Sequence, residues 1–101
     1  MNMTTEKQFL PTVIELLRCL GWEVDHTFEQ RQYAHRSSKG RPDIVAVRER
    51  VVWIEVKGDG GKLTPEQEYW IDLLKKARQE IYVIYPEDYY WLVEVLKRSH
   101  I

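Results

Sequence analysis

Three charged residues interrupt two short apolar segments near the middle of the sequence. Asp43 stands at the start of the first segment, and Glu55 and Lys57 stand near the end of the second. An unpaired charge buried in a strand costs more than any one apolar residue contributes, so we expect a use for these charges. Paired carboxylates bind hard divalent cations, and a nearby lysine can orient or deprotonate a water molecule or stabilise charge that develops on a phosphate.

The spacing predicts a hairpin that brings the two carboxylates together. If a three-residue turn joins the segments, Val47 pairs with Val51, and Asp43 lies directly across from Glu55. Cross-strand neighbours have Cβ atoms about 4.5–5.5 Å apart, so at least one carboxyl pKa rises unless a cation lies between them. A divalent metal resolves this repulsion, with Lys57 on the same face. The alternative is a salt-bridged cluster in which the lysine neutralises both carboxylates without metal or chemistry.

The rest of the chain predicts the elements that must position this hairpin. Apolar periodicity and turn residues indicate an α/β fold in the order α-β-β-β-α-β-α, with helices packed on a sheet. The expected elements are a helix over 5–20, a strand over 22–28, a polar loop over 29–41, hairpin strands over 43–47 and 51–57, a helix that opens at Thr64, a strand over 80–85 and a helix over 87–98.

The first helix has clear end signals and one irregularity. Thr4 or Thr5 serves as its N-cap, and Gly21 ends it. Pro11 lies inside the predicted range and is expected either to kink the helix or to move its start to a later residue.

Composition favours an intracellular domain that does not cross membranes. A chain of 101 residues, 44% hydrophobic and 31% charged, is expected to form a single domain over 1–101. No segment is long and apolar enough for a membrane span or a signal peptide. Cys19 is the only cysteine, which excludes an intrachain disulfide. The net charge of −1 lacks the strong basic excess of many nucleic-acid binders, but residues 31–41 carry basic residues and no acid.

Several blocks of the sequence together resemble a known nuclease family. Pro42-Asp43 followed by Glu55-Val56-Lys57 resembles the PD-(D/E)XK signature. The blocks KGRPDIVAV and WIEVKGDGGKLTPEQ, with a first helix that ends in LGW, are similar more narrowly to the VRR-NUC branch, and the resemblance spans roughly residues 5 to 96. It implies a restriction-endonuclease-like mixed sheet flanked by helices. The small size is similar to that of the stand-alone VRR-NUC proteins of phages and bacteria.

The resemblance assigns roles to the charged cluster. Asp43, Glu55 and the backbone carbonyl of Val56 would bind Mg²⁺ or Mn²⁺, and Lys57 would position the attacking water. Family members also place a glutamine near the active site, at the position of Gln67. That residue stands three after Thr64, where it completes a capping box, and it also lies on the apolar face of its helix. The two interpretations are compatible.

The family further uses a glutamate on the first helix, and the sequence offers Glu6 and Glu15. At 100° per residue, Glu6 falls on the apolar face with Leu10 and Val13, whereas Glu15 falls on the polar face. We therefore assign the role to Glu6. The alternative is that it is only an acidic residue favoured by the helix dipole in the first turn.

Basic residues around the predicted site are candidates for contacts with phosphates, which give affinity without sequence information. They are Arg31, Arg36, Lys39, Arg41 and Lys62. Tyr33 and His35 could stack on bases or sugars, and His26 could approach the site from its strand. For any one of these, a solvated or structural role is the alternative.

The expected function is a Mg²⁺- or Mn²⁺-dependent endonuclease that cuts branched DNA, Holliday junctions in particular. The resemblance to stand-alone members of the family also implies a homodimer. The expected location is the cytoplasm of a bacterial or phage-infected host. One alternative is a nicking or restriction-like nuclease without junction preference. Others are a DNA-binding module of the same fold that does not cleave, and a small interaction protein whose charges are structural.

Overall fold

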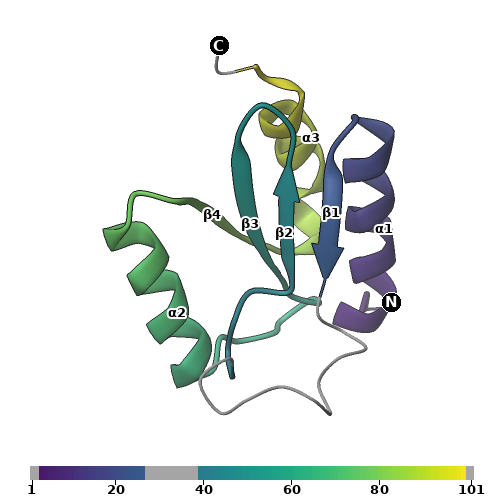
Figure 1. Ribbon diagram of the computed structural model, residues 1–101. Helices are drawn as coiled ribbons and strands as arrows, with labels where there is room; N and C mark the ends of the chain where they lie inside the picture. Colours follow the sequence, from purple (N-terminus) through teal and green to yellow (C-terminus); the bar gives the residue numbers. More distant parts are fainter. Residues whose placement is uncertain (1–2, 27–38, 100–101) are drawn as a thin grey trace.

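The chain forms a mixed sheet of four strands with helices on both faces (Figure 1). The computed structural model describes residues 3–26 and 39–99. The sheet order is β1-β2-β3-β4, antiparallel at β1–β2 and β2–β3 and parallel at β3–β4. The elements are α1 (Glu6–Cys19), β1 (Glu23–His26), β2 (Ile44–Val47), β3 (Val51–Val56), α2 (Pro65–Lys76), β4 (Glu80–Ile84), the 3₁₀ turn η3 (Pro86–Asp88) and α3 (Tyr89–Lys97). The predicted α/β order is confirmed.

The register of the β2–β3 hairpin is the predicted one. Val47 pairs with Val51, and Ile44 pairs with Ile54. One further step along the ladder brings Asp43 beside Glu55. Both strands are slightly shorter than predicted. At the end of the ladder, the Asp43 carboxylate replaces a backbone acceptor and binds the N–H of Val56.

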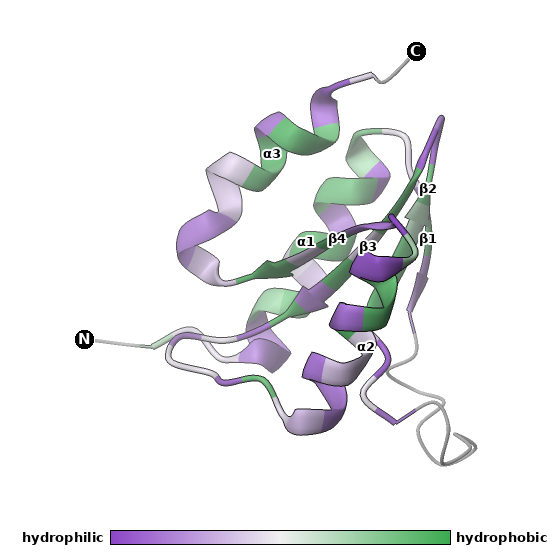
Figure 2. Cartoon of the chain, turned by 90° about the vertical axis from the view of Figure 1, so that its left-hand side faces the viewer, coloured by the Kyte–Doolittle hydropathy of each residue, from purple (hydrophilic) through white to green (hydrophobic). Residues whose placement is uncertain are grey.

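The helices divide between the two faces of the sheet. α1 and α3 cover one face, and α2 lies on the other (Figure 1). Figure 2 shows hydrophobic segments on part of α3, whereas α2 is mostly hydrophilic. Because side chains alternate along a strand, Val52 and Ile54 of β3 enter the core with α1 and α3, and Glu55 faces α2. Within residues 3–26 and 39–99, no helix is long and apolar enough to cross a membrane.

α1 begins at its predicted cap and passes through its proline. Thr5, rather than Thr4, is the N-cap, and it shares a capping box with Gln8. The expectation that Pro11 would move the start later is wrong, because the helix runs unbroken from Glu6. Pro11 and the residue four positions before it are exposed, so water can satisfy the carbonyl that lacks an N–H partner.

Two other boundaries differ from the predicted ones. The last helix begins at Tyr89 instead of residue 87, because Pro86 opens a 3₁₀ turn in which Asp88 accepts a hydrogen bond from the N–H of Tyr85. β1 covers residues 23–26 of the predicted strand 22–28. Residues 27–28 and most of the predicted polar loop lie outside the described residues.

The N-terminal end of α1 is packed directly against the chain that leaves β3. A Cβ added to Gly58 would lie 2.4 Å from the backbone nitrogen of Glu6 and 2.7 Å from the carbonyl carbon of Thr5. Asp59 strengthens the contact, since its backbone N–H donates to the Thr4 carbonyl and its carboxylate accepts from the Thr4 N–H. The contact requires glycine, because only glycine lets the two backbones approach this closely.

We expect Gly58→Ala to lower the free energy of unfolding by about 1–3 kcal/mol, since the new methyl group meets backbone that cannot move without displacing α1. Gly61→Ala is the matched control, because its Cβ would meet nothing closer than 3.2 Å. Urea denaturation of both variants measures the difference. Equal losses in the two variants would contradict the close packing of Gly58.

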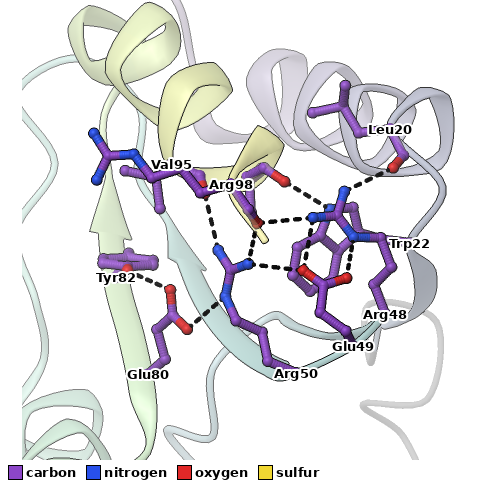
Figure 3. A network of polar contacts seen from close by, with 10 residues as sticks. Leu20, Trp22, Arg48, Glu49, Arg50, Glu80, Tyr82, Val95 and Arg98 are labelled. Atoms are coloured by element: carbon purple, nitrogen blue, oxygen red, sulfur yellow. Dashed lines mark hydrogen bonds and ion pairs between the residues drawn. The ribbon is translucent and has the colours of Figure 1, made fainter. Parts of the chain in front are cut away.

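The turn of the β2–β3 hairpin is clamped to two helix ends (Figure 3). Arg48 donates to the carbonyls of Leu20 and Arg98, at the C-terminal ends of α1 and α3. Arg50 donates to the carbonyls of Val95 and Arg98 and pairs with Glu80. Both guanidinium groups lie over the ring of Trp22. The clamp supplies additional donors to carbonyls at the C-terminal ends of the two helices, where intrahelical N–H partners run out.

Candidate active site

Four segments meet at the C-terminal end of β3. They are the end of β3 itself, the residues that lead into β2, the N-terminus of α1 and the N-terminus of α2. Gly58 fixes α1 at this point, as described above. Gly40, with φ +87°, fixes the entry to β2, because a Cβ there would lie 2.5 Å from the backbone of Glu66 in the first turn of α2. The two glycines therefore bring residues distant in sequence to one place.

Asp43 lies beside the end of β3 and is partly exposed. Its Oδ2 accepts a hydrogen bond from the N–H of Val56 at 2.9 Å. The N–H and C=O of one strand residue point to the same side of the strand, so the carbonyl of Val56 is directed to the side on which Asp43 lies. The carboxylate and this carbonyl are thus two oxygen donors on one side of β3.

Glu55 is a buried carboxyl group that is only partly compensated. Its residue is 1% exposed, and its Oε2 accepts from the Gln67 amide at 3.1 Å. Its Oε1 is buried and has no hydrogen-bond partner. Burial, followed by the charge of Asp43, raises the pKa of Glu55 to about 9, although the charge of Lys57 acts in the opposite direction. Without a cation, the site therefore holds Glu55 protonated at neutral pH.

Lys57 is a buried lysine surrounded by acceptors. It is 6% exposed, and its Nζ donates to Oε1 of Gln67 at 2.8 Å. The same Nζ lies 3.8 Å from the carboxylate of Glu55 and 3.9 Å from that of Glu6. A lysine ammonium has three donors. One is engaged by Gln67, and the others are directed into a cluster of oxygens where a water or a phosphate oxygen could be held.

Gln67 performs both roles that its position in the sequence suggested. The side-chain Oε1 of Gln67 accepts from the backbone N–H of Thr64, and the backbone N–H of Gln67 donates to the Thr64 hydroxyl, so the capping box is complete. Its amide also joins Lys57 to Glu55, as described above. The start of α2 is therefore built into the site.

We expect Gln67→Ala and Thr64→Ala each to lower the free energy of unfolding by about 1 kcal/mol, since each breaks the capping box. Only Gln67→Ala should also reduce the nuclease activity that the resemblance implies, by about tenfold or more, because it alone releases Lys57 and Glu55. Urea denaturation and a DNA cleavage assay on the same preparations compare the two. Equal activity in both variants would limit Gln67 to a capping role.

The two candidate glutamates of α1 lie in different places. Glu6 is partly buried and near Lys57, whereas Glu15 is exposed on the side of α1 away from the core. The structure thus brings together Glu6, Asp43, Glu55, Lys57 and Gln67. It leaves Glu15 outside this cluster.

The donor set fits a hard divalent cation. In the part of the chain that the structure describes, no three His, Cys, Asp or Glu residues form a metal-binding group, so the chain would supply two carboxylates, Asp43 and Glu55, and the carbonyl of Val56. Mg²⁺ typically binds few protein ligands and keeps several water molecules in its coordination shell. The buried, unpartnered Oε1 of Glu55 is the atom that most requires such a partner.

The basic residues predicted to contact DNA differ in exposure, and two of them lie outside the described residues. Arg31 and Arg36, like Tyr33 and His35, lie outside the described residues. Lys39 and Lys62 are exposed, and Lys39 forms an ion pair of 3.6 Å with an acid of α2. Arg41 is partly buried, and its Nε has no hydrogen-bond partner.

His26 does not approach the site. It pairs with Ile44, whose side chain lies in the core with α1 and α3. It lines a groove against Leu10 and Ile14 of α1, on the face of the sheet opposite to Glu55. The suggestion that it could approach the site is wrong, because strand alternation directs it to the other face.

Sequence reasoning missed the two glycines that assemble the site. Gly40 lies just before Pro42-Asp43, and Gly58 directly follows Glu55-Val56-Lys57. Each glycine permits a close approach between backbones. A glycine beside a strand end often marks such an approach, so the signal was present. The glycine signal does not indicate which segment of the chain packs against each glycine.

Fold and site together define a class. A mixed four-stranded sheet flanked by helices, with an aspartate before one hairpin strand and Glu-x-Lys at the end of the next, is the restriction-endonuclease-like arrangement. Comparison with protein-family models matches the VRR-NUC domain over residues 2–88. The chain belongs to the VRR-NUC family, and membership implies a nuclease-type function in DNA processing. Comparisons with curated proteins and with solved structures gave no match.

Proposed function

We propose that the protein is a Mg²⁺- or Mn²⁺-dependent endonuclease that hydrolyses phosphodiester bonds in branched DNA as a homodimer. The observation that carries the metal dependence is Glu55. Its buried Oε1 has no partner and lies beside a second carboxylate, Asp43, whose charge raises its pKa. A divalent cation would both give the buried Oε1 a partner and neutralise the repulsion between Glu55 and Asp43. A salt-bridged cluster leaves Oε1 without a partner.

Each side chain of the site has a separate role in the proposed hydrolysis. A bound cation would polarise the scissile phosphate and lower the pKa of its water. Lys57, oriented by Gln67, holds the attacking water or stabilises charge on the phosphate. Glu6 lies within 3.9 Å of the same ammonium and helps to orient that water. The water gives up a proton to solvent as its oxygen forms the new bond to phosphorus, one bridging P–O bond breaks, and the leaving oxygen takes up a proton from solvent.

Dimerisation and branched DNA rest on likeness to stand-alone members of the family. Two equivalent sites related by a two-fold axis suit two equivalent strands of a junction. An exposed aromatic pair on α3 supports a protein contact, since Tyr90 is 81% and Trp91 53% exposed. Such side chains are favoured in interfaces.

The test incubates the protein with labelled four-way junction, linear duplex and single-stranded DNA, each with Mg²⁺, Mn²⁺ or EDTA. Symmetric, metal-dependent nicking of the junction alone is the expected result. Cutting of all three substrates would support instead the nuclease without junction preference. Binding without cutting under any metal would leave a DNA-binding module of the same fold.

A further inference from the structure

We propose that Arg41 forms a dedicated site for one phosphate of the DNA backbone, next to the phosphate that is cleaved. This rests on the proposed function, which requires DNA to reach the carboxylates. It singles out one residue from the basic group as a built anion site and gives that residue a defined position on the substrate.

The first observation is a buried hydrogen-bond donor of Arg41 that has no partner. Arg41 is partly buried, and its Nε is buried without a hydrogen-bond partner. Among the residues that the structure describes, its guanidinium takes part in no hydrogen bond or ion pair. Burial of a charged donor without a partner is unfavourable, so the free protein keeps a group that an incoming anion would satisfy.

The other cations near the site differ in this respect. Lys57 is held by Gln67, and Lys39 pairs with Glu66. Lys62 is exposed and hydrated at no cost. Arg41 alone among these four combines burial with the lack of a described partner.

The second observation is its direction. Burial alternates without interruption from Arg41 to Ala46, with Pro42, Ile44 and Ala46 buried and the residues between them partly exposed. β2 begins at Ile44, and the alternation of burial continues through the residues that lead into it, so Arg41 lies on the more exposed side of the chain with Asp43, two residues away. Pro42 is fully buried, which anchors the backbone between the two side chains.

The backbone at Arg41 is also held in place. The preceding Gly40, at φ +87°, is packed on the backbone of Glu66 with no room for a side chain. The arginine therefore extends from a fixed point between α2 and β2. Preorganisation of this kind lowers the cost of binding.

A phosphodiester is the ligand that fits. Guanidinium binds phosphate through two parallel hydrogen bonds. The carboxylate of Asp43 repels a DNA backbone when no cation is bound, and an arginine two residues away offsets that repulsion. Because Arg41 lies two residues from Asp43 on the same side of the chain, a phosphate next to the scissile one is the nearest anion that it could bind.

The experiment uses DNA in which single phosphates are replaced, one at a time, by neutral methylphosphonates. Binding is measured by fluorescence anisotropy in EDTA, so that no cleavage is needed. In the wild-type protein, replacement of the phosphate that Arg41 contacts should weaken binding about tenfold. In Arg41→Met, that position should become insensitive while every other position keeps its effect.

Lys76→Met is the matched control, because it removes an exposed cation in the last turn of α2, outside the group of predicted phosphate contacts, and should leave the interference pattern unchanged. An Arg41→Met pattern identical to the wild-type pattern would overturn the proposal. In urea, Arg41→Met without DNA should be at least as stable as the wild type, since a buried N–H donor without a partner is removed. A clear loss of stability would assign Arg41 a structural role instead.

The outcome is separable from that of the proposed function. If DNA is bound with the Arg41-dependent position but never cut with Mg²⁺ or Mn²⁺, the nuclease proposal fails and the phosphate site stands. If DNA is cut but no position depends on Arg41, the nuclease stands and the phosphate site fails. If no DNA binds, both fail.

Discussion

Lys57→Met is expected to slow DNA cleavage by about 10²–10⁴-fold, the range found when a positioned group for proton transfer or charge stabilisation is removed. Methionine fills most of the buried space that lysine occupies but cannot hold a water or a phosphate oxygen. Single-turnover cleavage with saturating protein measures the chemical step, and anisotropy measures DNA binding separately. Binding should change far less than the rate.

Lys75→Met is the control for this variant, because Lys75 is exposed in the last turn of α2, remote from the site. It should cleave at the wild-type rate. A Lys57→Met protein that folds, binds DNA and still cleaves at the wild-type rate would remove the lysine from the mechanism and support a purely structural cluster of charges.

The stability of the metal-free protein is expected to fall as the pH rises from about 5 to 9. The pKa of Glu55 is raised from its ordinary value of 4.5 to about 9 in the folded protein. Between these values the folded state keeps a proton that the unfolded state releases. The unfolded state therefore binds fewer protons, and the free energy of unfolding decreases with pH by at most about 1.4 kcal/mol per unit.

Glu55→Gln should remove this slope and make the metal-free protein more stable at pH 8, since a neutral amide replaces a carboxyl that burial holds protonated. Saturating Mg²⁺ should oppose the slope in the wild type, because the cation binds the carboxylate form and stabilises it by linkage. Urea midpoints at several pH values, in EDTA and in Mg²⁺, measure both effects.

Glu49→Gln is the matched control for the pH series. Its hydrogen bond with Arg48 lowers the pKa of Glu49 to about 2, so its contribution is lost only as the pH falls below the ordinary range of a glutamate. The variant should keep the wild-type slope between pH 5 and 9. A wild-type protein whose stability is flat over that window would show that Glu55 is ionised and compensated without metal.

Local signals predicted the parts of the fold that depend on neighbours in sequence. The caps at Thr5 and Thr64 follow from side chains that bond their own backbone three residues later. The pairing of Val47 with Val51 follows from the length of the turn and from strand alternation. The same register made the meeting of Asp43 and Glu55 predictable.

Features that depend on distant contacts were beyond such reasoning. Periodicity placed Glu6 on the inner face of its helix, but its approach to Lys57 requires the contact at Gly58, which links segments 52 residues apart. The unpartnered Nε of Arg41 depends on what surrounds it in space. Nothing in the spacing of Arg48 and Arg50 indicates that the end of α3 passes beside their turn.

That turn has a consequence for how the molecule can be altered. Hairpin turns usually accept inserted residues, tags or fused domains at little cost, because they project into solvent. Here Arg48 and Arg50 fasten the turn to the ends of α1 and α3, so an insertion would release three elements together. Insertions in the hairpin turn are therefore expected to be poorly tolerated, and length variation among related proteins is expected at the opposite end, around the candidate active site.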